Sequence, residues 1–282
     1  MSGGKNPSLA SPSSVGYFLD MPLTKNQIRD LRALSQKKFR DDSDLFLVEG
    51  SRLLREAVGS TFEIAEVYHT AAFGATAEGA KLLETLRRRA SLREVTEREL
   101  GSFSDTVNAQ GIAAVLAQRH DSPSAMVKPG DGASSLVAVD ALSDPGNLGS
   151  IIRTCDWFGM DGLLIGQNSV DLYNPKVVRS TMGGLFHLPV VQGVDLPVAC
   201  THAKELGYTI YATDPEGSAH FDRIPYASKS IIVFGNEAWG ISDAVRASAD
   251  TRVSIRRYGS AESLNVGVAC GIVLSATRKL KE

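Results

Sequence analysis

The stretch Asp144-Pro-Gly-Asn-Leu-Gly-Ser-Ile-Ile-Arg153 decides the fold of this 282-residue chain, because an apolar strand is predicted before it and a helix within it. Two later stretches share its build, Phe234-Gly-Asn-Glu-Ala-Trp-Gly240 and Gly259-Ser-Ala-Glu-Ser-Leu-Asn-Val266. Each sets glycines beside polar side chains at a predicted turn, and all three lie in the C-terminal half. Turns that join strands to helices carry the ligand sites of α/β proteins, so together they predict one site.

Strands and helices alternate through the region that carries these turns. The predicted strands are Leu136–Leu142, Gly162–Ile165, Tyr208–Thr213, Ser230–Phe234 and Thr251–Ile255. The predicted helices are Leu148–Phe158, Pro175–Met182, Val198–Leu206, Ser242–Ser248 and Val266–Leu280. The strands are apolar throughout, which is typical of a sheet covered on both faces. Residues 135–282 are therefore predicted to form an α/β domain with a parallel sheet.

The N-terminal half predicts a smaller α/β unit over residues 23–118. Its predicted helices are Thr24–Phe39, a segment through Leu53 and Val58, and Ala77–Arg89, and its predicted strands are Phe46–Gly50, Ile64–Tyr68 and Gly111–Leu116. Residues 1–22 are rich in Ser, Gly and Pro and are expected to be a flexible extension. Residues 119–134 contain two prolines and two glycines and are interpreted as a polar linker between the two units.

Composition narrows the class of protein. With 43% hydrophobic residues the chain can bury a core, and a net charge of −2 argues neither for nor against a nucleic-acid partner. The three cysteines, Cys155, Cys200 and Cys270, are far apart, so they predict buried thiols without a disulfide framework or a metal site. No apolar run reaches the roughly 18 residues of a membrane span, and no signal-peptide pattern is present, so a cytoplasmic protein is expected.

In the first stretch, Asp144-Pro-Gly breaks the strand and Asn147 is suited to cap the helix that follows. The helix residues expected to face the core are Leu148, Ile151, Ile152 and Cys155. Arg153 is off this stripe. An arginine there is most simply a solvated helix residue, but its place beside a turn at the carboxyl end of a strand favours a functional role.

In the second stretch, Gly235 at the strand end would let a ligand approach the backbone. Glu237 could accept hydrogen bonds from hydroxyl or amine groups, although an acidic residue at a helix start would also suit the helix dipole. In the third stretch, Ser263 and Asn265 are both suited to cap the apolar helix after them. Capping and substrate contact are compatible, so the third turn also stays a candidate.

The three stretches contain sequence motifs that resemble those of a known protein family. Asp-Pro-Gly-Asn-Leu-Gly-x-Ile-x-Arg, Gly-Asn-Glu-x-x-Gly and Ser-Leu-Asn-Val, in this order and spacing, resemble those of the SpoU/TrmH family in the SPOUT superfamily. The resemblance covers residues 136–280, with Asn174-Pro-Lys-Val-Val-Arg179 and Leu185-Phe-His-Leu-Pro189 between the motifs. Residues 24–118 look like the substrate-binding domain of that family, through Phe46-Leu-Val-Glu-Gly50 and Gln110-Gly-Ile112.

The resemblance implies an RNA 2′-O-ribose methyltransferase that uses S-adenosylmethionine and acts on ribosomal RNA in preference to transfer RNA. It implies a parallel sheet with a C-terminal deep trefoil knot, a homodimer, no metal and no membrane. By motif position, the residues around the acceptor ribose would be Asn147, Arg153, Glu237, Ser263 and Asn265. The residues that contact the cofactor, largely through backbone groups, would be Gly235, Ile255, Leu264, Gly240 and Thr213.

Two features of the motifs bear on mechanism. The family assigns Arg153 the removal of the 2′-hydroxyl proton, yet a guanidinium is almost always protonated. Arg153 is therefore either an unusually perturbed base or a cation that orients phosphate and stabilises the developing alkoxide. The third motif departs from the family, since Arg256 replaces a common proline and Gly267 a common serine. Arg256 and Arg257 would be able to contact phosphates instead.

Other functions are weighed against this one. Methylation of a base is disfavoured by the pair Asn147 and Arg153. A non-catalytic RNA-binding or ribosome-assembly factor with the same fold stays open as an alternative, as does transfer RNA as the substrate. A Rossmann dehydrogenase and an α/β-hydrolase are disfavoured, since no strand is followed by Gly-x-Gly-x-x-Gly and no Gly-x-Ser-x-Gly occurs.

Overall fold

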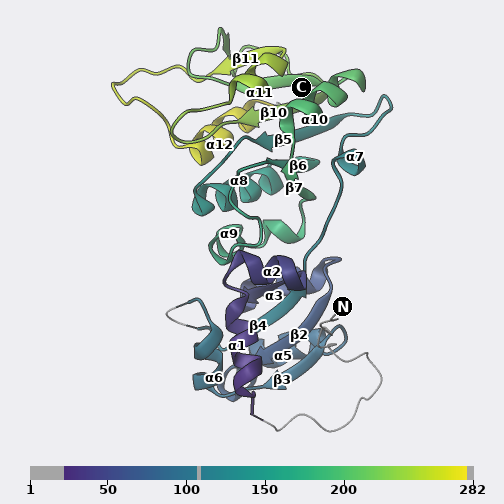
Figure 1. Cartoon of the computed structure of the whole chain (residues 1–282), viewed down its shortest axis with the longest axis vertical. Helices are drawn as coiled ribbons and strands as arrows, with labels where there is room; N and C mark the ends of the chain where they lie inside the picture. Colours follow the sequence, from purple (N-terminus) through teal and green to yellow (C-terminus); the bar gives the residue numbers. More distant parts are fainter. Residues whose placement is uncertain (1–21, 107–108, 278–282) are drawn as a thin grey trace, which may run out of the picture.

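The computed structural model describes residues 22–106 and 109–277. The expected extension over residues 1–22 lies outside this part of the chain apart from Pro22, as do the last residues of the final predicted helix. Two lobes follow one another along the long axis of the molecule, each with its own sheet (Figure 1). No helix in the described ranges is long and apolar enough to cross a membrane.

The N-terminal lobe is a four-stranded sheet in the order β1-β4-β2-β3. Its strands are β1 (Leu45–Glu49), β2 (Ile64–His69), β3 (Ser91–Glu94) and β4 (Ile112–Ala117). Strand β4 runs antiparallel to both neighbours, whereas β2 and β3 are parallel. The helices of the lobe are α1 (Lys25–Ala33), α2 (Lys37–Ser43), α3 (Ser51–Gly59), α4 (Ala71–Gly74), α5 (Ala77–Leu86) and α6 (Glu97–Phe103). Strand β3 and helix α6 were not predicted.

The single helix predicted over Thr24–Phe39 is wrong, because the chain forms α1 and α2 with a break between them. Thr24 begins α1 with a capping box, as the sequence suggests. The end of α1 is a tightened turn, since the backbone and hydroxyl of Ser35 both donate to the Arg32 carbonyl. The buried Arg40 guanidinium takes the next free acceptor, the Leu34 carbonyl, at 2.8 Å. A tertiary contact therefore fixes the break.

The segment between the lobes is ordered, so its interpretation as a plain polar linker is wrong in part. A short helix α7 (Pro123–Met126) forms within it, and Met126 and Val127 are buried against the second sheet. The ammonium of Lys229 donates to the carbonyls of Lys128 and Gly130 at 3.2 and 2.9 Å. Apolar packing and a buried cation together hold this segment in place.

The C-terminal lobe is a seven-stranded sheet in the order β7-β6-β5-β10-β8-β11-β9, and every pairing is parallel. Its strands are β5 (Ser134–Val139), β6 (Gly162–Gly166), β7 (Val190–Val194), β8 (Thr209–Thr213), β9 (Ala219–His220), β10 (Lys229–Phe234) and β11 (Thr251–Ser254). The five strands predicted for this region are confirmed. Strand β9 was missed because it has only two residues, and β7 because Gln192 and Gly193 interrupt its apolar pattern.

Helices cover both faces of this sheet (Figure 1). They are α8 (Pro145–Trp157), α9 (Pro175–Ser180), the 3-10 turn η1 (Gly184–Phe186), α10 (Leu196–Glu205), α11 (Asp243–Ser248) and α12 (Val266–Thr277). Alternate strand residues separate into two cores: Val137, Val139 and Ile232 pack with α8 and α12. Leu136 and Ala138 pack with α10 and α11. Burial on both faces explains the apolar runs of β6 and β10, in which every residue is buried.

The interior thiols fit the prediction made from their spacing. Cys155, Cys200 and Cys270 are free and buried. Burial raises the pKa of the Cys155 thiol, and its contact with Cys270 on the neighbouring helix α12 raises it further. A thiol held neutral in an apolar site is a poor nucleophile, so these residues serve packing.

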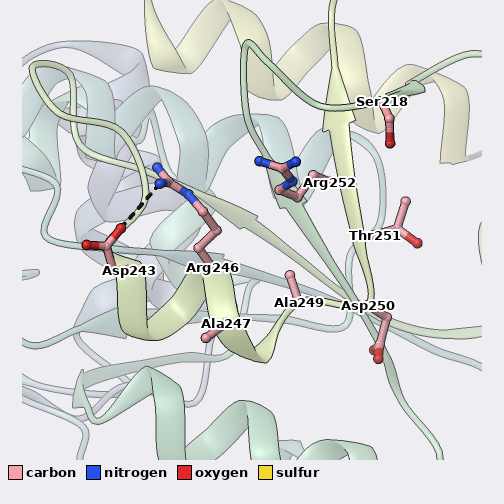
Figure 2. Close-up of a pocket in the computed structure, with 8 residues that line it drawn as sticks. All are labelled: Ser218, Asp243, Arg246, Ala247, Ala249, Asp250, Thr251 and Arg252. Carbon is pink, nitrogen blue, oxygen red and sulfur yellow. Dashed lines mark hydrogen bonds and ion pairs between the residues drawn. The ribbon is translucent and has the colours of Figure 1, made fainter.

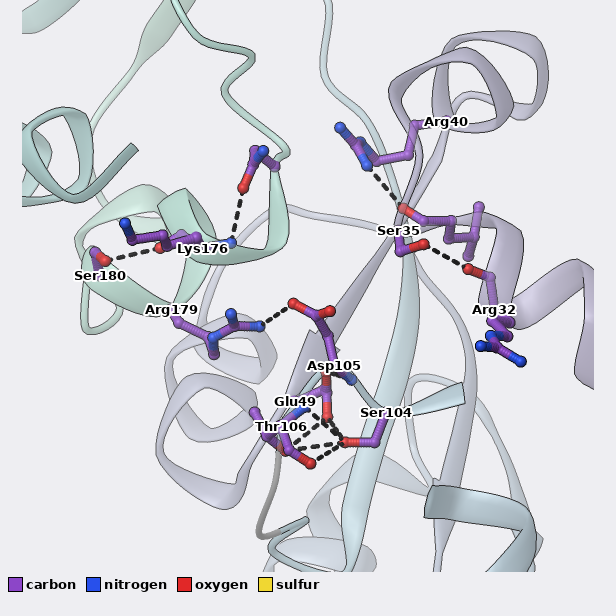
Figure 3. Close-up of polar contacts among 12 residues, drawn as sticks. Arg32, Ser35, Arg40, Glu49, Ser104, Asp105, Thr106, Lys176, Arg179 and Ser180 are labelled. Atoms are coloured by element: carbon purple, nitrogen blue, oxygen red, sulfur yellow. Dashed lines mark hydrogen bonds and ion pairs between the residues drawn. The ribbon is translucent and has the colours of Figure 1, made fainter. Parts of the chain in front are cut away.

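The two lobes share an apolar cluster. The rings of Phe46 and Tyr173 lie 4.5 Å apart, and those of Phe62 and Phe186 lie 5.3 Å apart. A buried ion pair joins the lobes, since the Arg40 guanidinium donates to Asp171 at 2.5 Å. Closer to the surface, Arg179 on α9 reaches Asp105 at 2.9 Å (Figure 3). The lobes are therefore held together by packing and by charge.

Candidate active site

The three motifs meet at the edge of the second sheet that is formed by the carboxyl ends of its strands. Strands β5, β10, β8 and β11 are neighbours and parallel, so their carboxyl ends line one edge. The first motif follows β5 and the second follows β10, its direct neighbour. The third lies between β11 and α12. The position of a ligand site at this edge, predicted from the sequence, is the one that open α/β sheets use.

Glu237 of the second motif binds the first motif through its carboxylate. One oxygen accepts from the Ser143 backbone at 3.3 Å and from the Ser143 hydroxyl at 3.0 Å. The other accepts from the Asp144 backbone at 3.2 Å and from the Asn147 side-chain amide at 2.9 Å. The alternative role of Glu237 at a helix start is excluded, because α11 begins only at Asp243. Glu237 therefore accepts from hydroxyl, amide and backbone groups of the protein, and its contact with a ligand stays a prediction.

These bonds keep Glu237 ionised. Partial burial on its own raises the pKa of the carboxyl, but the hydrogen bonds from Asn147, from backbone N–H groups and from Ser143 outweigh it and hold the pKa below its usual value. A fixed negative charge therefore lies at the centre of the edge. It orients the Asn147 amide so that its nitrogen faces Glu237 and its oxygen faces away.

Asn265 of the third motif completes the connection. Its amide nitrogen donates to the Asn147 oxygen at 2.9 Å. Its own oxygen accepts from the backbones of Gly267 and Val268 at 2.9 and 3.2 Å, which caps α12. The hydrogen-bonded chain Glu237–Asn147–Asn265, here called the motif triad, links all three motifs through side chains. The capping role predicted for Asn265 is confirmed, whereas Ser263 forms no hydrogen bond to the described residues.

The capping role predicted for Asn147 is wrong. The helix α8 begins at Pro145, and its cap is Asp144, whose carboxylate accepts from the Asn147 backbone at 2.8 Å. Proline at the first helical position makes Asp144 the natural cap, a signal that sequence reasoning missed. The consequence is functional, because the Asn147 side chain is left free for Glu237 and Asn265. Lys176 on α9 lies 3.8 Å from the same Asp144 carboxylate.

The second turn is built rigidly. Asn236 and Gly240 exchange two backbone hydrogen bonds of 2.9 and 3.0 Å, and the Asn236 amide donates to the Ala141 carbonyl at 2.6 Å. A side chain at Gly235 would lie within 2.2 Å of the Gly240 backbone, so glycine is required there by packing. Gly240 has a φ of +70°, which suits glycine. The predicted glycines therefore shape the turn itself, and Asn236, unremarked in the sequence, fixes it.

Arg153 and Ser263 stand apart from the motif triad. Both side chains are exposed, and neither forms a hydrogen bond or ion pair with the residues the structure describes. Arg153 lies two turns into α8, on the helix that α12 covers. A cation without a carboxylate partner among the described residues is available to an anionic ligand.

The candidate cofactor residues lie along the same edge. Thr213, Gly235 and Ile255 end or follow three adjacent parallel strands. The Thr213 hydroxyl donates to the Val233 carbonyl at 3.0 Å, so its proton is used within the sheet. Leu264 leaves 49% of its surface exposed although it is apolar. Backbone groups beside an uncovered apolar side chain are the kinds of group that line small-ligand sites.

A pocket of about 580 Å³ lies elsewhere, beside α11 and the beginning of β11 (Figure 2). It is lined by Arg246 and Arg252, whose charges are paired with Asp214 at 3.6 and 3.4 Å. None of the motif residues lines it. The size of the pocket therefore does not locate the active site.

The motif geometry agrees with the comparison with known proteins. The model of the SpoU rRNA Methylase family matches residues 134–275, the region that holds all three motifs. The chain belongs to this family. The model of an MRM3-like substrate binding domain matches residues 25–114, within the N-terminal lobe.

Relatives of this SpoU-family chain match almost its whole length. The 23S rRNA (guanosine(2553)-2′-O)-methyltransferase RlmP of Bacillus subtilis is 31% identical over 251 residues, covering 89% of this chain and 95% of that protein. The crystal structure of the SpoU methyltransferase AviRb from Streptomyces viridochromogenes, in complex with AdoMet, has a TM-score of 0.82 at 27% identity, covering 90% and 97%. An AdoMet-bound rRNA methyltransferase from Sinorhizobium meliloti has a TM-score of 0.80 at 27% identity, covering 91% and 95%.

Proposed function

We propose that this chain transfers a methyl group from S-adenosylmethionine to a ribose 2′-hydroxyl of RNA, with ribosomal RNA as the substrate. The motif triad carries this proposal, because it joins the three family motifs into one polar site at the sheet edge. The names of RlmP and AviRb support it, since RlmP is a 23S rRNA 2′-O-methyltransferase and AviRb is a SpoU methyltransferase.

The residues at the sheet edge would hold the cofactor. The backbones of Thr213, Gly235 and Gly240 would meet its polar groups, and Ile255 and Leu264 its apolar surface. When bound, S-adenosylmethionine supplies a methyl group activated by a positively charged sulfur. The fit rests on the convergence of three strand ends and on the exposed Leu264.

The motif triad would position the acceptor ribose. Asn147 and Asn265 are held at fixed orientations by the ionised Glu237 and by the start of α12. Amide groups that need no reorganisation at the moment of reaction lower the barrier by positioning the nucleophile. The exposed Ser263 lies two residues before Asn265 and adds a hydroxyl within the same loop.

Arg153 would act as a cation in this site. When the 2′-hydroxyl releases its proton to solvent, negative charge would develop on its oxygen, and this charge is consumed as the oxygen bonds to the methyl carbon. A guanidinium that stays protonated stabilises this charge and binds the neighbouring phosphate. The absence of any carboxylate partner for Arg153 among the described residues leaves its charge available for both roles.

Residues 23–118 would be the RNA-binding domain and residues 135–282 the methyltransferase domain. The C-terminal domain would contain a deep trefoil knot, for which the return of α12 to pack on α8 is a supporting feature. A homodimer would cover the apolar surface of those helices, where Trp157 and Val268 are 83% and 51% exposed. An enzyme that modifies ribosomal RNA would work in the cytoplasm.

Labelled-methyl transfer tests the proposal. RNA and ribosomal subunits from a strain that lacks the gene are incubated with the full chain and methyl-labelled S-adenosylmethionine, and the product is hydrolysed with alkali. Label in alkali-resistant dinucleotides of ribosomal RNA is expected, since a 2′-O-methyl group blocks cleavage. Label on a base, or in transfer RNA alone, would contradict the proposed substrate. No transfer to any RNA would favour a non-catalytic RNA-binding factor.

A further inference from the structure

The segment between β11 and α12 carries three consecutive exposed side chains, Arg256, Arg257 and Tyr258. Tyr258 is 88% exposed, the most exposed of the large hydrophobic side chains described. The Arg256 guanidinium lies over the Tyr258 ring, 5.9 Å from its centre. In Figure 1 the yellow-green segment between β11 and α12 projects sideways from the sheet. An aromatic ring and two cations are thus presented together to the surroundings.

These two arginines differ from the arginines just before them in sequence. Arg246 and Arg252 are paired with Asp214, and Arg246 also with Asp243 (Figure 2). Arg256 and Arg257 have no carboxylate partner in the part of the chain that the structure describes. Arg257 donates to the Ala261 carbonyl, at 3.3 Å. Their positive charge is therefore not neutralised by any carboxylate of residues 22–106 and 109–277.

The segment is tied to the active site at its far end. Asn265, seven residues after Tyr258, is bonded to Asn147 in the motif triad. An extended chain spans at most about 3.5 Å per residue, so Tyr258 lies within about 25 Å of that amide. A ligand that occupies the triad and extends from it by a few nucleotide lengths comes within reach of the segment.

The positive charge of the segment distinguishes between three molecules that could bind to it. S-adenosylmethionine has a net positive charge, so two unpaired arginines are unsuited to enclose it. A second copy of the chain across a two-fold axis would bring arginines of the same sign to the axis. RNA carries a negative charge on every phosphate, and its unstacked bases pack on tyrosine rings and on guanidinium planes.

We propose that Arg256, Arg257 and Tyr258 bind a single-stranded RNA nucleotide beside the target ribose. The two arginines contact phosphates, and Tyr258 stacks on a base with Arg256 against the ring. The inference rests on the proposed function in that the RNA bound here is the substrate. It adds a positioning site formed by Arg256, Arg257 and Tyr258, directly before the stretch Gly259–Val266 of the third motif.

Binding of a 20-nucleotide oligouridine RNA to the full chain, followed by fluorescence anisotropy at several salt concentrations, tests the proposal. Tyr258→Ala should weaken binding by at least about fivefold, whereas Tyr258→Phe should stay within about twofold because stacking needs only the ring. The double variant Arg256→Gln and Arg257→Gln should reduce the salt slope by about 1.4, the value for two single-strand phosphate contacts. Arg252→Gln is the matched control, with RNA binding unchanged.

Affinity for S-adenosylmethionine, measured by calorimetry on the same variants, should be unchanged. A fall in cofactor affinity with RNA binding intact would overturn the proposal and make the segment a wall of the cofactor site. A shift to a smaller species in sedimentation with RNA binding intact would make it a subunit contact. If wild type transfers no methyl group but the variants still bind RNA less tightly, the proposed function fails and only the binding of RNA by this segment stands. Methyl transfer by wild type with unaltered RNA binding by Tyr258→Ala would overturn the inference alone.

Discussion

Two regions join distant parts of the chain through polar side chains. One is the junction between the lobes, and the other is the edge formed by the carboxyl ends of the strands, where the motif triad lies. At the junction, the side chains of Arg40 and Asp171 are only 2% and 7% exposed. At the edge, Glu237 and Asn147 are half-buried, and Arg153 and Asn265 are exposed. Burial makes the loss of one partner costly to folding, whereas exposure lets water replace it. The comparison separates residues that hold the fold from residues available to a substrate.

The junction should show the largest effect on stability. Arg40→Met leaves the Asp171 carboxylate buried without its partner, so the free energy of unfolding should fall by about 3–5 kcal/mol. Denaturant unfolding followed by circular dichroism measures this. The double variant Arg40→Met and Asp171→Leu should recover most of the loss. A single variant as stable as wild type would show that the junction contributes no more than a surface contact.

Arg153→Ala should lower activity and leave stability unchanged, in contrast to Arg40→Met. Methyl transfer should fall by about 100-fold or more, the usual cost of removing a group that stabilises developing charge. The free energy of unfolding should change by less than about 0.5 kcal/mol, since the side chain is exposed. Arg153→Lys separates the two possible roles. Substantial retained activity supports a cation, whereas a loss as complete as in Arg153→Ala supports a guanidine base.

Asn265 has one contact within the motif triad and one that caps α12, so its variants can separate an effect on activity from an effect on stability. Asn265→Asp keeps the oxygen that caps α12 but cannot donate to Asn147, so methyl transfer should fall about tenfold with stability nearly unchanged. Asn265→Ala removes the cap as well and should cost about 1 kcal/mol of unfolding free energy in addition. Steady-state transfer rates and thermal unfolding of both variants test this. Equal stabilities of the two would show that the cap contributes nothing.

The smallest expected effect is the pH dependence of the stability that Glu237 contributes. Because its pKa is lowered in the folded protein, its contribution to stability is complete above the usual value near 4.5 and is lost as the pH falls through the lowered value. The difference in unfolding free energy between wild type and Glu237→Gln should therefore be constant from pH 7 to about 5 and shrink below that. Partial exposure limits it to about 1 kcal/mol. A difference that grows with acid would contradict the lowered pKa.

Much of this arrangement could be predicted from the sequence, because it depends on local patterns. Apolar runs bounded by glycine fixed the five central strands, and parallel neighbours then place three turns at one edge. Glu237 was found as an acceptor because it follows a strand end.

What escaped prediction depends on contacts between distant residues. The break between α1 and α2 follows from the burial of Arg40 against the second lobe. The free side chain of Asn147 follows from competition with Asp144, which local capping preference did not resolve. Strand β7 contains Gln192 and Gly193, so its apolar pattern is interrupted.

The most direct test of the account is mass spectrometry of nucleosides from ribosomal RNA treated with S-adenosylmethionine and either wild type or Arg153→Ala. Both proteins should unfold at the same denaturant concentration. One 2′-O-methylated nucleoside is expected with wild type and almost none with the variant. A base-methylated nucleoside, or equal 2′-O-methylation by the two proteins, would contradict the assignment of the motif edge as a ribose methylation site.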